Sequence, residues 1–125
     1  MSLRILYVDD EADIREIVAL SLSLDPEMEV ETASSGAAAI ERAGKGRLDL
    51  ILLDVMMPTM DGPAVFAELR KTETTRDIPV AFVTARTQQH EVTHFLELGA
   101  VGVIAKPFDP MTLARQVRRL CSHGE

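Results

Sequence analysis

The stretch LILLD at residues 50–54 constrains the fold of this chain more than any other part of the sequence. Four consecutive apolar residues without polar alternation are typical of a strand that is covered on both faces, as in parallel sheets. Pro58 ends this pattern, and Gly62 belongs to a turn signal before the next helix. Ligands gather at the carboxyl edge of open parallel sheets, so Asp54 is a candidate site residue.

The rest of the chain repeats this alternation of strand and helix patterns. Apolar or alternating runs predict strands at residues 3–8, 28–33, 48–53, 79–83 and 101–105. Helical spacing predicts helices at 14–22 and 37–43, around 65–69 and 92–96, and from about residue 110. We therefore expect an α/β fold: a flavodoxin-like (βα)5 three-layer sandwich with a five-stranded parallel sheet in the order 2-1-3-4-5.

Length and composition limit the classes of protein that remain. At 125 residues the chain is expected to form a single domain over 1–125, with its core at about 3–121. A net charge of -7 argues against a nucleic-acid surface and favours a cation as small partner. The single cysteine, Cys121, and the lack of a long apolar run or signal-peptide core predict a soluble cytoplasmic protein that crosses no membrane.

Polar side chains follow four of the expected strands at their carboxyl ends, which share one edge of the sheet. They are Asp9, Asp10, Asp54, Thr84 and Lys106. Several carboxylates in one partly buried cleft repel one another unless one is protonated or a cation lies among them. An oxygen-only ligand set fits Mg²⁺ best, with Mn²⁺ as an alternative. Under the simpler interpretation, the acids only cap the following helix, whose N-terminus favours negative charge.

Lys106 and Pro107 indicate a constrained turn, for which a cis peptide is one solution, that holds the lysine ammonium inward. A buried lysine needs an anion, and Asp54, or a phosphoryl group attached to it, would supply one. Phosphoryl transfer depends on charge neutralisation and alignment, for which a divalent ion, a lysine and a hydroxyl such as that of Thr84 are the expected parts. Alternatively, Thr84 is an ordinary threonine at a strand end.

Along nearly its whole length the chain resembles the receiver domain of two-component response regulators, of the CheY-like kind. The resemblance rests on Val8-Asp9-Asp10-Glu11, Asp54 to Gly62, Thr84-Ala85, Gly99-Ala100 and Lys106-Pro107-Phe108. It implies that Asp54 accepts a phosphoryl group from a phosphohistidine of a sensor histidine kinase or a phosphotransfer protein. It also implies that Asp10, Asp54 and the Met56 carbonyl hold Mg²⁺, with Asp9 bound directly or through water, while Thr84, the Ala85 amide and Lys106 bind the phosphoryl oxygens.

The same resemblance implies a phosphorylation-dependent signalling switch and not a metabolic enzyme, since such domains only promote their own phosphorylation and slow dephosphorylation. The family commonly has a tyrosine or phenylalanine three residues before the lysine, whereas this chain has Val103, which we expect to pack as an ordinary strand residue. We expect no output domain within these 125 residues. The chain therefore binds a downstream protein target, or belongs to a longer regulator, and a homodimer is a further outcome.

Residues 90–94, HEVTH, match the zincin pattern H-E-x-x-H and would alone predict a zinc metalloprotease. The extended metzincin form needs glycine at position 97 and histidine at position 100, where this chain has Glu97 and Ala100. Val92, Phe95 and Leu96 are expected to form the buried stripe of that helix, which turns the two histidines toward solvent.

Three further alternatives depend on single features. A magnesium-dependent aspartyl-phosphate phosphatase of the haloacid-dehalogenase type resembles Asp-x-Asp at its nucleophile, but this chain has Met56 as the second residue. A flavin-binding flavodoxin would place a phosphate where this chain has acids. Arg115, Arg118 and Arg119 form a stripe on the last helix that is either a solvated face or, with the neighbouring helix, a partner or dimer face.

Overall fold

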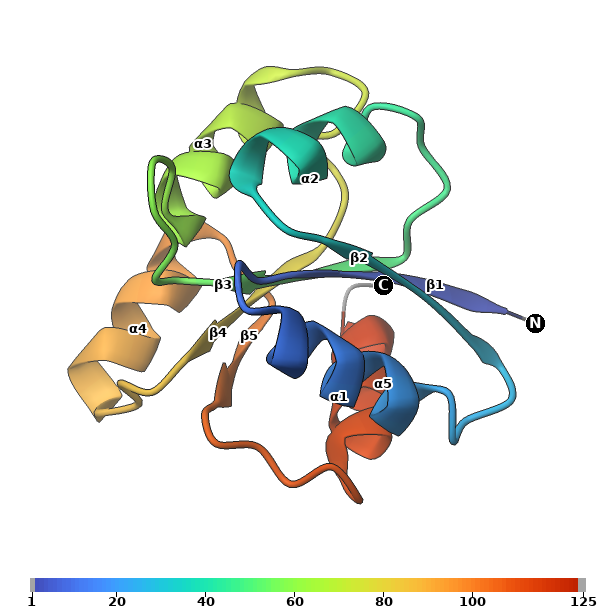
Figure 1. Cartoon of the computed structure of the whole chain (residues 1–125). Helices are drawn as coiled ribbons and strands as arrows, with labels where there is room; N and C mark the ends of the chain where they lie inside the picture. The colour runs from blue at the N-terminus through green and yellow to red at the C-terminus, as the bar shows by residue number, and fades with distance from the viewer. Residues whose placement is uncertain (1, 124–125) are drawn as a thin grey trace.

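The computed structural model describes residues 2–123, in which five strands alternate with five helices (Figure 1). The elements are β1 (Leu3–Val8), α1 (Ala12–Leu22), β2 (Met28–Ala33), α2 (Gly36–Ala43), β3 (Leu50–Asp54), α3 (Gly62–Lys71), β4 (Val80–Thr84), α4 (Gln89–Leu98), β5 (Gly102–Ala105) and α5 (Leu113–His123). All strand pairs are parallel, and the sheet has the order β2-β1-β3-β4-β5. The predicted fold class and strand order are confirmed.

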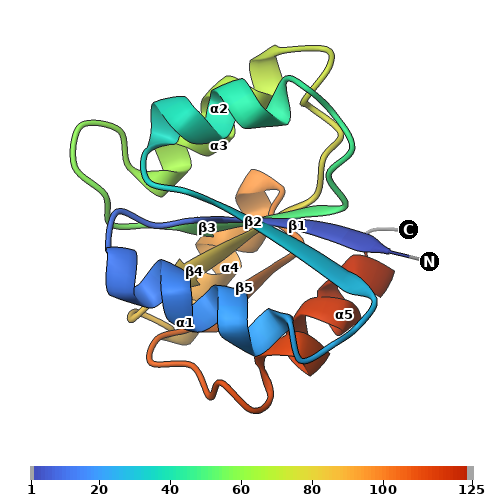
Figure 2. The ribbon, with the colours of Figure 1, turned by 45° about the vertical axis from the view of Figure 1, so that its right-hand side comes forward.

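Helices cover both faces of the sheet, so the molecule has three layers. Helices α2 and α3 lie on one face, and α1 and α5 lie on the other (Figures 1 and 2). Each face has its own apolar core, and Phe95 of α4 packs into the core on the α2 and α3 side. In that core the ring of Phe82 lies between Phe66 and Phe95, with centroid distances of 5.6 and 4.6 Å.

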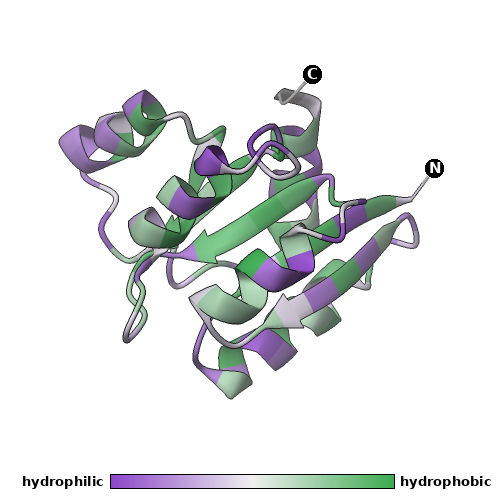
Figure 3. Ribbon diagram, turned by 90° about the horizontal axis from the view of Figure 1, so that it is seen from above, coloured by the Kyte–Doolittle hydropathy of each residue, from purple (hydrophilic) through white to green (hydrophobic). Residues whose placement is uncertain are grey.

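Strand β3 runs through the centre of the sheet, and all five of its residues are buried. The central strands are hydrophobic along nearly all of their length, while the helices alternate hydrophobic and hydrophilic residues (Figure 3). This two-sided burial explains the uninterrupted apolar run in the sequence. Among residues 2–123 no helix is both long and apolar enough to cross a membrane.

A close approach between the end of β3 and the start of α3 requires glycine at position 62. A Cβ atom there would lie 2.6 Å from the carbonyl oxygen of Asp54, and the Gly62 amide donates to the Val55 carbonyl at 3.0 Å. Asp61 caps the helix by accepting a hydrogen bond from the Ala64 amide at 2.9 Å. The turn therefore holds α3 directly against the backbone of the candidate site residue.

The bounds of β1 and β2 are as predicted, whereas the other elements differ from their predicted bounds by up to three residues at an end. Asp54 and Thr84 are the last residues of their strands and not the first residues beyond them. The ladder extends this far because Asp54 pairs with Val83 and the Lys106 amide donates to the Thr84 carbonyl at 2.9 Å. Helix α5 begins at Leu113 and not near residue 110, since Asp109 organises a preceding turn by accepting from the Met111 amide through its side chain.

Candidate functional site

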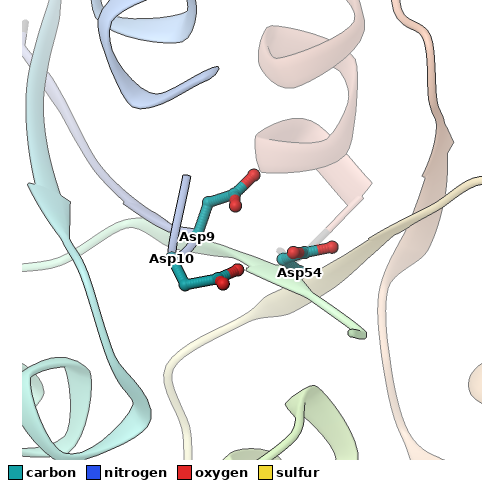
Figure 4. A group of neighbouring side chains, drawn as sticks. All are labelled: Asp9, Asp10 and Asp54. Atoms are coloured by element: carbon teal, nitrogen blue, oxygen red, sulfur yellow. The ribbon is translucent and has the colours of Figure 1, made fainter. Parts of the chain in front are cut away.

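Three carboxylates meet at the carboxyl edge of the sheet, as Figure 4 shows. Asp9 and Asp10 follow β1, and Asp54 ends β3. One oxygen of each lies within 4.8 Å of the others. Asp9 and Asp54 are buried, with 0% and 4% of their surface exposed, whereas Asp10 is exposed and opens the cluster to solvent.

The register of the sheet explains why these aspartates converge. Val8 is paired with Leu53 in adjacent parallel strands, so Asp9 and Asp54 are the next residues of both strands at the same edge. The residues are 45 positions apart in sequence, and only the parallel pairing of β1 with β3 brings them together. The predicted acidic cluster is therefore present.

Lys106 completes the cluster from the end of β5. Its Nζ atom lies 3.0 Å from Oδ2 of Asp9 and 3.2 Å from Oδ1 of Asp54, and 20% of its side chain is exposed. The Lys106–Pro107 peptide is cis, as the sequence indicated. The ammonium thus offsets part of the repulsion between the two buried carboxylates.

The pKa values of Asp54, Asp9 and Lys106 are each shifted from their ordinary values. Burial, followed by the negative charge of Asp9, raises the pKa of Asp54 to about 6, although Lys106 acts in the opposite direction. Burial alone would raise the pKa of Asp9, but hydrogen bonds from the Glu11 amide, the Tyr7 hydroxyl and Lys106 hold it below its ordinary value. Burial opposes the charge on Lys106, yet its contacts with Asp9 and Asp54 raise its pKa overall. At neutral pH the site therefore holds ionised Asp54 beside a charged lysine.

Two residues that sequence reasoning missed also hold Asp9. The Tyr7 hydroxyl donates to Oδ2 of Asp9 at 2.7 Å, and the Arg15 guanidinium donates to the Asp9 carbonyl at 2.8 Å. The alternation of side chains in a strand places residues 7 and 9 on the same side, which was the available signal for Tyr7. Arg15 left no comparable signal, because its contact depends on the angle at which α1 leaves the sheet.

The remaining predicted site residues lie around this cluster, and the Met56 backbone forms a hydrogen bond with the Asp54 carboxylate that acts to lower its pKa. The Thr84 side chain is buried at the end of β4, and its hydroxyl accepts a hydrogen bond from the Arg86 amide at 3.0 Å. Ala85 is exposed in the following loop, and Met56 follows β3 with 74% of its surface exposed. Val103 is partly buried against the core on the α2 and α3 side, so the expectation that it packs is confirmed.

The histidines of the H-E-x-x-H pattern do not form a metal site in the structure. His90 and His94 are exposed on α4, and within residues 2–123 the aspartate cluster is the one group of three or more His, Cys, Asp or Glu side chains close enough to share an ion. The predicted buried stripe was too wide. Phe95 is the one buried residue of α4, Val92 is only partly buried, and Leu96 is 46% exposed.

The arginine stripe on α5 is divided in the structure. Arg115 and Arg119 are exposed, whereas Arg118 donates to Asp25 at 2.6 Å and to Glu27 at 2.9 Å. The Arg118 guanidinium is therefore committed to the segment between α1 and β2. A partner face on α5 stays a prediction, and Arg118 is not a free charge in it.

The donor set of the aspartate cluster fits a hard divalent cation. Its nearby ligands are carboxylate oxygens, and two of the three carboxylates are buried where an uncompensated charge is costly. The sequence model of the family described as "Response regulator receiver domain" matches residues 5–118. The chain belongs to this family of receiver domains. Receiver domains are signalling switches that bind Mg²⁺ at an acidic pocket, and they are not classical enzymes.

Several known proteins are similar to this receiver domain. Response regulator PleD of Caulobacter vibrioides is 44% identical over 122 residues, which are 96% of this chain and 26% of PleD. The phosphate regulon transcriptional regulatory protein PhoB of Escherichia coli is 39% identical over 118 residues, which are 94% of this chain and 51% of PhoB. The chain therefore spans about a quarter to a half of the length of these relatives.

The fold of the receiver domain is also found in solved structures. The chemotaxis response regulator CheY4 of Vibrio cholerae superposes with a TM-score of 0.86 at 34% identity, and the match covers 96% of this chain and 99% of CheY4. The family suggested by the sequence motifs is thus confirmed by a family model, by sequence similarity over nearly all of this chain and by structure.

Proposed function

We propose that Asp54 is the phosphoryl acceptor of this receiver domain and that Mg²⁺ bound by Asp9, Asp10, Asp54 and the Met56 carbonyl is required for the reaction. The observation that carries the proposal is the placement of one buried carboxylate, Asp54, 3.2 Å from Lys106 and beside two further aspartates. Mn²⁺ would serve in place of Mg²⁺, because it accepts the same oxygen ligands.

The chemistry assigned to Asp54 is the formation of an acyl phosphate. An oxygen of the ionised carboxylate attacks phosphorus, the bond from phosphorus to the histidine nitrogen of the donor breaks, and that nitrogen leaves with the bond electrons. The pKa of about 6 leaves most of Asp54 ionised at neutral pH, as a nucleophile must be. Bound Mg²⁺ supplies charge neutralisation for the phosphoryl oxygens.

Lys106, Thr84 and the Ala85 amide are assigned to the phosphoryl group. Lys106 already contacts Asp54, so its ammonium would be able to contact the oxygens of a phosphoryl group on Asp54 without leaving the site. The Thr84 hydroxyl would exchange its contact with the Arg86 amide for a phosphoryl oxygen, which would alter the loop between β4 and α4. Val103 packs in the core, so this switch operates with no aromatic ring at that position.

The partners follow from this chemistry. The donor would be a sensor histidine kinase or a histidine phosphotransfer protein, and the output would be a downstream protein, a second copy of the chain or an attached output domain. We further propose that residues 1–125 act as one receiver domain, of which Met1 and residues 124–125 lie outside the described part. The predicted cytoplasmic location stays a prediction.

A phosphatase of the haloacid-dehalogenase type is the second candidate, and it is disfavoured by one residue. That mechanism needs a second acid two residues after the nucleophile, where Met56 offers only a thioether side chain that is 74% exposed. Repeated turnover of a phosphomonoester would support the phosphatase, whereas a single phosphoryl group bound per chain supports the receiver.

Intact mass after incubation with acetyl phosphate tests the proposal directly. The wild type should gain one phosphate when Mg²⁺ is present and none in excess chelator. Asp54→Ala should gain none under either condition, while Asp13→Asn, which changes an exposed aspartate in α1, should behave as the wild type. A phosphorylated Asp54→Ala protein, or labelling that ignores Mg²⁺, would contradict the proposal.

A further inference from the structure

Tyr7 has an unusual pair of environments for a core tyrosine. Its ring belongs to the apolar core on the α1 and α5 side, and only 1% of the residue is exposed. Its hydroxyl reaches the carboxyl edge of the sheet and donates to Oδ2 of Asp9 at 2.7 Å. A buried phenol needs a hydrogen-bond acceptor, and this one uses a carboxylate of the candidate metal site in place of a backbone carbonyl.

The hydrogen bonds of Asp9 leave its two oxygens unequal. Oδ2 accepts from both Tyr7 and Lys106, at 2.7 and 3.0 Å. Oδ1 accepts only from the Glu11 amide, at 3.0 Å. Each carboxylate oxygen offers about two lone-pair positions, so Oδ2 is fully used and Oδ1 has one position left.

We propose that Tyr7 is a positioning residue that makes Asp9 meet a cation through Oδ1 alone and thereby favours Mg²⁺ over Ca²⁺. The inference rests on the metal site of the proposed function. Mg²⁺ requires near-octahedral geometry with single oxygen contacts, whereas Ca²⁺ accepts carboxylates that bind through both oxygens. With Oδ2 occupied by Tyr7 and Lys106, Asp9 cannot present both oxygens to one ion.

Tyr7→Phe removes the hydroxyl and keeps the ring in the core. It frees one lone-pair position on Oδ2 and lets the Asp9 carboxylate rotate, so the dissociation constant for Mg²⁺ should rise about tenfold, as for other residues that orient metal ligands. Ca²⁺ binding should weaken by less than about threefold, because the released oxygen can contribute to a larger and more flexible coordination shell. Discrimination between the ions should therefore fall.

Thr75→Val is the matched control. Thr75 follows α3 and also has a buried hydroxyl, which donates to the Leu69 carbonyl of that helix at 2.6 Å. This hydrogen bond lies outside the aspartate cluster. Calorimetric titration of both ions into wild type, Tyr7→Phe and Thr75→Val separates a local effect on Asp9 from general loosening of the fold. The control should lose stability and keep both ion affinities.

A second measurement needs no variant at all. Tyr7 is the one tyrosine of the sequence, which has no tryptophan, so its fluorescence reports a single hydroxyl. A cation on Oδ1 withdraws charge from the carboxylate that accepts the Tyr7 hydrogen bond, and emission should change with the same midpoint as calorimetric Mg²⁺ binding.

Thermal melts of Tyr7→Phe establish that the variant used for the affinities is folded.

The outcomes separate this inference from the proposed function. Wild type that binds no Mg²⁺ would remove the metal site and the role of Tyr7 together. Wild type that binds Mg²⁺ while Tyr7→Phe binds it equally well, or loses both ions to the same extent, would overturn the role of Tyr7 alone. The same holds if Tyr7 emission stays constant while calorimetry records binding.

Discussion

Replacing Asp54 with asparagine is expected to stabilise the metal-free protein at neutral pH, because folding places this carboxylate in an unfavourable environment. Burial and the charge of Asp9 raise its pKa from the ordinary value of 3.8 to about 6. At about 1.4 kcal/mol for each tenfold change in proton affinity, ionised Asp54 weakens the folded state by about 3 kcal/mol relative to its protonated form. Asparagine has nearly the same size and carries no charge.

The effect has a defined dependence on pH. Below 3.8, the ordinary pKa, the carboxyl group of Asp54 is protonated in both the folded and the unfolded chain. Between 3.8 and about 6 the unfolded chain has released this proton and the folded chain has not, so wild-type stability falls as the pH rises. The loss is complete above the folded pKa of about 6. The advantage of Asp54→Asn should therefore be small near pH 4 and full near pH 7.5 (about 3 kcal/mol).

Urea unfolding in excess chelator measures this difference. With a slope of about 1–3 kcal/mol per molar urea, the midpoint of Asp54→Asn should exceed that of the wild type by at least about 1 M at pH 7.5. Asp13→Asn, an exposed change in α1, should alter stability by less than about 1 kcal/mol. Added Mg²⁺ should stabilise the wild type and not Asp54→Asn, since only the wild type retains all three carboxylates.

Two results would refute the reasoning. A variant no more stable than the wild type at pH 7.5 would mean that Lys106 fully offsets both the burial of ionised Asp54 and its repulsion by Asp9. A gain of equal size at pH 4 and pH 7.5 would show that the effect of asparagine comes from packing and not from charge.

Three other substitutions test the construction of the site. Gly62→Ala should cost about 1–3 kcal/mol and slow phosphorylation of Asp54, because its Cβ would lie 2.6 Å from the Asp54 carbonyl oxygen; urea unfolding and time-resolved intact mass measure both effects. Lys106→Met should raise the pKa of Asp54 above about 6, since it removes the cation that lowers it; NMR titration of the carboxyl carbon measures the change. Phe82→Ala should cost about 3–5 kcal/mol in urea unfolding, because its ring fills the space between Phe66 and Phe95.

For each of these substitutions, one result would contradict the reasoning behind the predicted effect. Gly44→Ala is the control for Gly62→Ala, because Gly44 has a φ of -63° and its nearest neighbour to a new Cβ is 3.5 Å away; equal losses for both would remove the close-approach argument. A lower or constant pKa of Asp54 in Lys106→Met would contradict the assigned ion pair. A loss below about 1 kcal/mol for Phe82→Ala would mean that the core collapses around the missing ring.

The fold and the acidic edge could be predicted because their signals are local. The apolar run before Asp54 marks a strand buried on both faces, and alternating strand and helix patterns admit few topologies. Once the strands are parallel, the ends of β1 and β3 must share an edge, which places Asp9 near Asp54. The boundaries were less certain, since the pairing of Asp54 and Thr84 with neighbouring strands extends each strand by one residue.

Contacts between side chains from different elements could not be predicted in this way. The stripe predicted for α4 was too wide, and Arg118 was grouped with Arg115 and Arg119 as one stripe although it pairs with Asp25, between α1 and β2. Periodicity indicates which face of a helix is apolar, but the depth of its contact depends on how the helix lies on the sheet.

The sequence by itself determined the order of elements, the parallel sheet and the set of residues gathered at one edge, because these depend on hydrophobic period and chain connectivity. Only the tertiary structure decided which atoms meet there. The Tyr7 hydroxyl and the Lys106 ammonium occupy the same oxygen of Asp9, and Asp54 is buried deeply enough to shift its pKa. Such properties depend on distances of about 3 Å and on exclusion of water, which arise when separate elements pack together.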